Sequence, residues 1–360
     1  MKLWCVNILI FGICAGLWSC QSASSDYRTP QIEEGIATDS LDAAPKPLPS
    51  KRLYSAKENS TEGSIHIAVD ESLRPLIEEE IATFMALHPR ATIQAHYLPG
   101  EAAIAHMLAS DTIRMAISSR ELTADEDALM RERIITVDYA TIGFGAVSLL
   151  THRDNPVKQL SLQQLRGIMS GQLQTWNEIE PEAPAQPIRL VFDHAQSGPK
   201  KFLQDSLLQG QMIKGERVFA LDSTVSMLEY VRQQPWSLGV GGWAWVSDVD
   251  RPLARRYRQE LTILSLERNP DTDSACVEQT NFFGPYQSYL AQRCYPLTRP
   301  IKTVLRETIY GLGTGFVAFL NGPAGQRILH KHGLCAVKGI SRELRFPPKE
   351  GAKKIRKDLN

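Results

Sequence analysis

The chain has 360 residues, of which 43% are hydrophobic and 22% are charged. This composition is that of an ordinary globular protein with enough apolar residues for a sizeable core. Its 40 Lys and Arg residues balance 40 Asp and Glu residues, so the formal net charge is +0 and no bulk field attracts nucleic acid. We expect no nucleic-acid partner, and any affinity for anions must be local.

The first 20 residues predict export. A basic start precedes an apolar run over residues 3–18, which is too short to span a bilayer comfortably and is typical of a secretion signal. The sequence Leu-Trp-Ser-Cys that ends at Cys20 resembles the lipobox of bacterial lipoproteins, in which the cysteine is acylated. We therefore expect a lipoprotein signal peptide over 1–19 and a lipid anchor on Cys20, which gives a membrane-anchored lipoprotein facing the periplasm. The alternative is a plain signal peptide or a first helix of the fold.

Three regions of different composition follow the signal. Residues 20–62 are rich in Ser, Ala, Pro, Asp and Glu, and such a segment cannot bury enough apolar surface to fold alone. We interpret it as a flexible tether. The folded body runs from about residue 63 to 346, and residues 347–360 form a basic tail.

Three of the six cysteines are expected to remain free of the signal and the anchor: Cys276, Cys294 and Cys335. An exported protein can form disulfides, and Cys276 with Cys294 would close a modest loop. The sequence does not decide whether these two are bridged, because it does not show whether they approach within bonding distance.

The first half of the body alternates strands and helices. The pattern predicts strands over 64–69, 91–98 and 114–117, and helices over 73–86, 101–109 and 123–133. Thr123 followed by Glu126 is a capping box that opens the third helix. This βαβαβα order predicts a mostly parallel sheet with helices on both faces, whose ligands lie at the carboxyl ends of strands.

Polar groups follow three of the expected strands. Ser72 follows the first strand, and Ser118 with Ser119 ends the third. A further strand over 188–192 leads to Ser197 and Gly198, and a helix begins there. The free N–H groups at a helix start favour an anion, so these ends could form an anion site. For a single strand end, the alternative is an ordinary capped helix.

An ordered set of motifs in the second half resembles one family. A strand over 142–151 leads to Asn155 and Pro156. Leu-Ser-x-x-x-Leu over 160–165, Ile-x-x-Gly over 168–171 and a Trp-Asn pair at 176–177 follow. This order is similar to that of the phosphate-type substrate-binding proteins of ABC transporters. LGVGGW over 238–243, YPLTR over 295–299 and a helix pair over 315–334 continue the resemblance, which spans residues 64–337.

The resemblance implies an α/β fold of two lobes, the type II periplasmic-binding-protein fold. Each lobe would be a mixed, mostly parallel sheet flanked by helices, with the ligand in the cleft between them. Lobe I would comprise 61–147 and 252–346, and lobe II would comprise 148–251. The implied function is capture of inorganic phosphate or a related oxyanion for an ABC permease, without catalysis, cofactor or metal.

The family's anion-binding positions carry over in part. The implied ligand-binding residues are Ser72, Ser118, Ser119, Arg120, Ser197 and Gly198. Two departures stand out: Pro199 occupies a position where the family often has Thr, and Arg114 stands where the family has an aspartate that accepts a proton from phosphate. A replacement acceptor would have to come from Asp70, Glu71 or Asp193, or the acceptor is missing. We expect weaker selection of phosphate over sulfate than the family resemblance suggests.

Other readings of the sequence are weaker. His194 lies beside Asp193 and near Ser197, but neighbours in sequence cannot line up as nucleophile, base and orienting group. His330 and His332 are two residues apart in an expected helix, so they face different ways and predict no metal site. The second class of function left open is a non-transport lipoprotein that uses this scaffold for sensing, adhesion or assembly.

Overall fold

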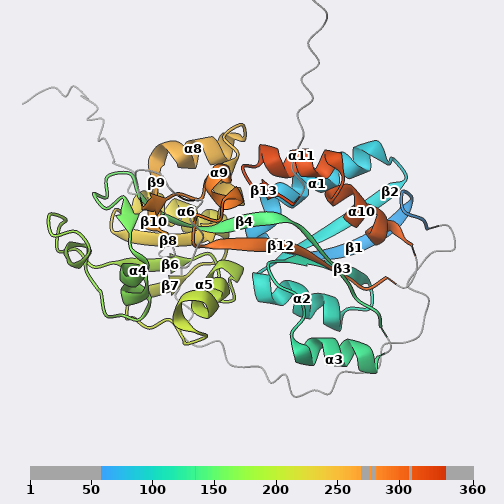
Figure 1. Cartoon of the computed structure of the whole chain (residues 1–360), viewed down its shortest axis with the longest axis horizontal. Coiled ribbons are helices and arrows are strands. Elements are labelled where there is room, and N and C mark those ends of the chain that lie inside the picture. Colours follow the sequence, from blue (N-terminus) through green and yellow to red (C-terminus); the bar gives the residue numbers. More distant parts are fainter. Residues whose placement is uncertain (1–57, 134, 269–275, 277–280, 308–309, 338–360) are drawn as a thin grey trace, which may run out of the picture. The chain divides into compact units, whose positions relative to one another are not determined.

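The computed structural model describes residues 58–133, 135–268, 276, 281–307 and 310–337 (Figure 1). The expected signal peptide, the anchor at Cys20, most of the tether and the basic tail lie outside the described residues. Within the described ranges, no helix has both the length and the apolar character that a membrane span requires.

Strands and helices alternate along most of the chain (Figure 1). The strands are β1 Gly63–Asp70, β2 Ala91–Leu98, β3 Ile113–Ser118, β4 Asp138–His152, β5 Gln159–Leu160, β6 Arg189–Phe192, β7 Val218–Ala220, β8 Ser237–Gly242, β9 Leu261–Ile263, β10 Ser265–Glu267, β11 Phe282–Phe283, β12 Thr298–Leu305 and β13 Cys335–Ala336. The α-helices are α1 Arg74–Leu87, α2 Gly100–Ala109, α3 Ala124–Glu132, α4 Leu162–Met169, α5 Gly198–Leu208, α6 Thr224–Gln233, α7 Ala244–Ser247, α8 Pro252–Glu260, α9 Gln287–Ala291, α10 Leu312–Leu320 and α11 Pro323–Lys331. Short 3-10 helices are η1 Glu71–Leu73 and η2 Trp176–Glu178.

The main sheet is mixed, with the strand order β2-β1-β3-β12-β4-β8-β6-β7, and β9 and β13 also pair with β4. Strand β1 is parallel to β2 and β3, and β6 is parallel to β7 and β8. Strands β12 and β4 run antiparallel to their neighbours. A second sheet contains β11, β10 and β5. The predicted α/β class, with parallel strand pairs joined through helices, is confirmed.

Strand β4 belongs to both parts of the main sheet. Its residues 138–146 pair with β12, and from Val147 onward it pairs with β8. The strand predicted over 142–151 therefore begins earlier in the structure, at Asp138. Strand β12 pairs with the polar residues that precede the apolar run. The change of partner falls next to the predicted lobe boundary at 147/148, although the lobe ranges themselves stay a prediction.

Alternate residues of β1 supply two hydrophobic cores. Ile65, Ile67 and Val69 join the core cluster that includes Phe84 of α1, whereas Ala68 joins the cluster of α2 residues. Successive side chains of a strand point to opposite faces, so β1 is covered on both sides. Figure 1 shows α1, α10 and α11 on one side of this sheet region and α2 and α3 on the other. This confirms the prediction of helices on both faces.

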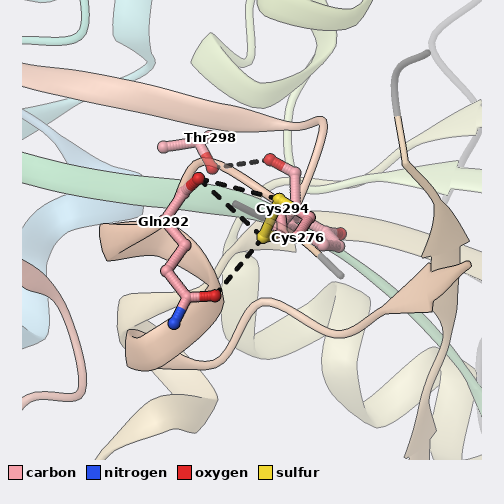
Figure 2. Close-up of a disulfide and its surroundings, with 5 residues drawn as sticks. Cys276, Gln292, Cys294 and Thr298 are labelled. Carbon is pink, nitrogen blue, oxygen red and sulfur yellow. Dashed lines mark hydrogen bonds between the residues drawn. A yellow bond between two sulfur atoms is a disulfide. The ribbon is translucent and has the colours of Figure 1, made fainter. Parts of the chain in front are cut away.

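A disulfide joins Cys276 to Cys294, across a sequence separation of 18 (Figure 2). This settles the pairing that the sequence left open. The bridge packs against Phe283 and Tyr289 and lies beside Gln292 at the end of α9. Cys335 is the free cysteine among the described residues.

Candidate functional site

The end of β1 carries a buried carboxylate that orders the following turn. Asp70 is 1% exposed and caps η1: its Oδ1 accepts hydrogen bonds from the backbone N–H of Ser72 at 2.9 Å and from the Ser72 hydroxyl at 2.7 Å. An aspartate at this position satisfies an N–H group that a helix start leaves without an internal partner. The predicted site residue Ser72 is thereby held in one orientation.

Arg299, at the second position of β12, brings a positive charge to this turn. It is 1% exposed, and its Nη1 lies 3.4 Å from Asp70 Oδ2. Its Nη2 donates to the Ser72 hydroxyl at 2.5 Å, and its Nη1 donates to the Ser119 hydroxyl at 3.4 Å. One buried guanidinium thus joins the ends of β1 and β3, and its planar fork is suited to oxyanions.

The starts of α2 and α5 meet at this point. A Cβ atom on Gly198 would lie 2.4 Å from Asp70 Oδ2, and a Cβ atom on Gly100 would lie 2.5 Å from the Cα of Gly198. Any side chain at either position would collide with the opposite backbone or carboxylate, so glycine is required at both. Ser197 caps α5 by accepting from the N–H of Lys200. The predicted residues Ser72, Ser119, Ser197 and Gly198 therefore converge.

Two further carboxyl groups border the set. Asp193, which follows β6, is 3% exposed; its Oδ2 accepts from the Thr224 hydroxyl at 3.2 Å, and its buried Oδ1 has no hydrogen-bond partner in the described structure. Glu71 Oε1 accepts from the N–H of Thr224, the first residue of α6, at 3.4 Å. Both groups meet at the start of α6, where partial positive charge favours an anion.

Burial changes the acidity of these two groups. Burial, reinforced by the nearby charge of Asp70, raises the pKa of Asp193 to about 6. Burial and the charge of Asp193 raise the pKa of Glu71 to about 7. At neutral pH Glu71 is therefore partly protonated, which reduces the net negative charge of the set, whereas Asp193 is mostly ionised and can still accept hydrogen bonds. An oxyanion that approaches Arg299 then meets less negative charge from Glu71 than full ionisation would give.

Two residues singled out in the sequence, Arg120 and Arg114, lie elsewhere, and Ser118 makes no described contact with Arg299. Arg120, one-quarter exposed, pairs with Glu126 at 2.7 Å and with Glu101 at 3.3 Å, so two carboxylates already neutralise it. Ser118 is buried at the end of β3, but Ser119 makes the described contact with Arg299. Arg114, near the other end of β3, is buried beside Glu58 and Glu307 at 2.6 and 3.6 Å. The expected replacement of a site aspartate by Arg114 therefore does not place a second arginine among the serines.

Arg299 is a candidate site residue that was not predicted from the sequence. It is the last residue of the YPLTR motif, which was recognised as part of the resemblance but given no role. Arg299 and Ser72 are 227 residues apart in sequence, so no local pattern indicates their contact. The contact depends on the pairing of β12 with β3, and no local sequence signal shows that pairing.

This geometry defines a class of protein: an α/β binding protein whose ligand would be held at strand ends and helix starts rather than on a catalytic constellation. The family model described as PBP superfamily domain matches residues 55–323, and the chain belongs to this superfamily of periplasmic binding proteins. The predicted two-lobed periplasmic-binding-protein fold is confirmed.

Relatives and solved structures agree with this assignment. A phosphate-binding protein PstS from Staphylococcus haemolyticus is 25% identical over 251 residues, which are 69% of this chain and 71% of that protein. The chain shares its fold with a phosphate ABC transporter substrate-binding protein with bound phosphate from Clostridium perfringens (TM-score 0.59, 21% identity, 77% of this chain and 100% of that one).

A phosphate transport receptor from Vibrio cholerae has a TM-score of 0.56 at 18% identity, and covers 76% of this chain and 100% of its own. The resemblance to phosphate-type substrate-binding proteins is confirmed. The expectation that the chain is not an enzyme agrees with these three relatives, each of which is named for binding or transport.

Proposed function

We propose that this chain is an extracytoplasmic solute-binding protein that captures phosphate or a related oxyanion and delivers it to an ABC permease. The observation that carries the proposal is the buried guanidinium of Arg299, which contacts Ser72 and Ser119 beside the start of α5. Charge-assisted donors in a buried setting are the strong ones. The names of the relatives support phosphate as the first anion to test.

Asp193 would be the acceptor that selects the anion. At neutral pH phosphate carries at least one proton and sulfate carries none. The unpartnered Oδ1 of Asp193 could accept that proton's hydrogen bond, whereas sulfate would leave it unpaired. The structure thus supports a replacement for the aspartate that the sequence analysis found missing. If it acts this way, phosphate is preferred more strongly than Arg114 alone suggested.

The test is calorimetric titration of the purified protein with phosphate and with sulfate. Arg299→Lys keeps the charge but loses the fork, and we expect it to weaken phosphate binding at least about tenfold. Arg120→Ala is the matched control because this arginine is paired with Glu101 and Glu126, and its phosphate affinity should stay within about twofold. Asp193→Asn should relax discrimination against sulfate.

Two results would count against this assignment. If Arg120→Ala abolishes binding and Arg299→Lys does not, the anion lies at the position that the sequence analysis gave to Arg120. If the wild-type protein binds neither phosphate nor sulfate, capture of these oxyanions is excluded. The non-transport role in sensing, adhesion or assembly then becomes the better explanation.

The proposed form is a lipoprotein anchored through Cys20, supported by the lipobox-like sequence. A fatty-acid analogue should label the wild-type protein in growing cells, and Cys20→Ala should abolish the label and release unanchored or precursor protein. Cys14→Ala is the control, because Cys14 lies inside the expected signal and its loss should leave labelling unchanged. Labelling that persists in Cys20→Ala would refute the anchor.

A further inference from the structure

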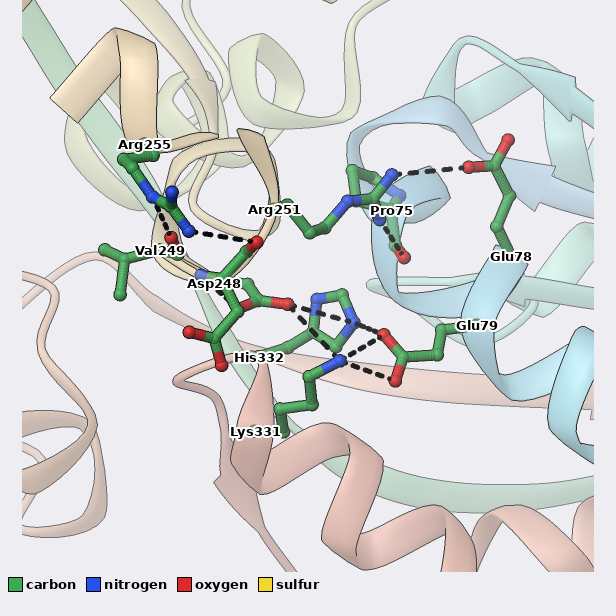
Figure 3. Close-up of polar contacts among 10 residues, drawn as sticks. Pro75, Glu78, Glu79, Asp248, Val249, Arg251, Arg255, Lys331 and His332 are labelled. Carbon is green, nitrogen blue, oxygen red and sulfur yellow. Dashed lines mark hydrogen bonds and ion pairs between the residues drawn. The ribbon is translucent and has the colours of Figure 1, made fainter. Parts of the chain in front are cut away.

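A second polar cluster lies where α1, α11 and the end of α7 meet (Figure 3). It consists of Glu79 from α1, Asp248 directly after α7, and Lys331 with His332 at the end of α11. The hydrogen bond between His332 Nε2 and Glu79 Oε2 is 2.9 Å long, and Lys331 Nζ lies 2.8 Å from Glu79 Oε1. Figure 3 shows these four side chains pointing toward one another.

Asp248 is the member of this cluster with an unpaired buried carboxylate oxygen. Its side chain is 2% exposed, yet its Oδ2 has no hydrogen-bond partner in the described structure. The nearest cationic groups are Lys331 Nζ at 3.8 Å and His332 Nε2 at 4.0 Å. A buried carboxylate oxygen without a hydrogen-bond partner costs folding free energy. Buried carboxylates in proteins are therefore normally paired with a cation or bound to a metal.

The neighbouring Arg251 makes no described contact with Asp248 Oδ2. Arg251 donates to the backbone carbonyl of Pro75 and lies 3.7 Å from Glu78 (Figure 3). Lys331 is the cation closest to Asp248, but its side chain is 45% exposed and its described hydrogen bonds go to Glu79. A long, exposed lysine can swing into solvent at little cost, so its ammonium is a replaceable counter-charge.

The cluster has the composition of a metal site. One atom from each of Glu79, Asp248 and His332 lies within 4.8 Å of the other two. Two carboxylate oxygens and one imidazole nitrogen are ligands that Zn²⁺ and similar divalent ions accept, and a water would complete a four-coordinate site. The other oxygen of Asp248 accepts from the N–H of Asp250 at 3.0 Å, which fixes the carboxylate as outer hydrogen bonds fix metal ligands.

We propose that Glu79, Asp248 and His332 form a binding site for a divalent metal ion of the zinc class, which displaces the ammonium of Lys331. The ion joins α1 and α11 to the segment between α7 and α8, so it stabilises the contact among these elements. The site is separate from Arg299 and its partners, and it does not depend on the proposed function. The proposal departs from the expectation of no metal site, which rested on the spacing of His330 and His332, and only His332 takes part in it.

The experiment is titration of the full chain with Zn²⁺ against a chromophoric chelator, with the melting temperature measured in parallel. We expect one tight site whose occupation raises the melting temperature. Asp248→Asn, which is nearly isosteric, should weaken that site at least about tenfold. Lys331→Met should strengthen it, because the competing ammonium is gone while the three ligands remain.

The control is the exposed pair His66 and His96, whose ring nitrogens lie 3.0 Å apart and could bind zinc independently. The double variant His66→Gln with His96→Gln should leave the tight site unchanged. The proposal is overturned if the tight site disappears in this double variant and persists in Asp248→Asn. It is also overturned if the wild-type chain binds no zinc, or if Lys331→Met fails to strengthen binding. Lys331 is a surface residue, so that variant decides the matter even if Asp248→Asn does not fold.

Discussion

Glu80 shows how a single buried residue couples stability to pH. Its side chain lies in α1 with 1% exposure, and its Oε2 has no hydrogen-bond partner in the described structure. Burial, followed by the charge of Glu79, raises the pKa of Glu80 from 4.5 to about 9. The folded protein therefore holds this proton in a range where the unfolded chain releases it.

The stabilising contribution of this proton is complete below about pH 4.5 and is lost as the pH rises toward 9. Across that window we expect the free energy of unfolding to fall by up to about 1.4 kcal/mol per pH unit through this group. Glu80→Gln should remove that slope and make the protein more stable than wild type at pH 8. Urea unfolding at several pH values measures it, with Glu78→Gln on the exposed part of α1 as the control. A slope that is unchanged in Glu80→Gln would contradict the prediction.

Individual site residues were predictable only where they follow their own strand. Ser72, Ser119 and Ser197 could be proposed because each stands at a strand end, and parallel strand ends share an edge. Arg299 enters near the start of an antiparallel strand from late in the chain, and no local pattern shows which strands it will join. Arg120 follows two of the serines in sequence, but its guanidinium forms ion pairs with Glu101 and Glu126 instead.

At the scale of elements, most of the helices and strands that local sequence signals predict are present in the structure. The capping box of Thr123 and Glu126 is present at the start of α3, and the three strands of the first half form close to their predicted bounds. The strand order was outside the reach of these signals. The insertion of β12 between β3 and β4 depends on pairing between segments far apart in sequence.

The cluster of Glu79, Asp248 and His332 illustrates the same limit. Each residue is unremarkable in its own segment, and the pair His330 and His332 pointed away from a metal site. The cluster exists because α11 and α7 both pack against α1. Helix packing of this kind is set by the shapes of three apolar surfaces, and it cannot be deduced from the spacing of polar residues.

For the whole molecule, the described conformation is closed at the candidate site. Asp70, Asp193, Ser197 and Arg299 are each 3% exposed or less, and Gly100 lies against Gly198. An anion can reach Arg299 only if the starts of α2 and α5 separate. We therefore infer an open state that exchanges with this closed one, and a ligand that favours the closed state.

This inference leads to a prediction about closure in solution. Saturating phosphate should lower the radius of gyration measured by X-ray scattering, because bound ligand shifts the population toward the closed state. Gly198→Ala should abolish this compaction and weaken phosphate binding at least about tenfold, since the new Cβ would lie 2.4 Å from Asp70 Oδ2 in the closed state. Gly145→Ala is the matched control, because a Cβ there meets its nearest neighbour at 3.6 Å, an ordinary contact. If Gly198→Ala compacts as the control does, the meeting of α2 and α5 is not the point of closure. If wild type binds phosphate without compaction, the anion is held without closure between the two helix starts.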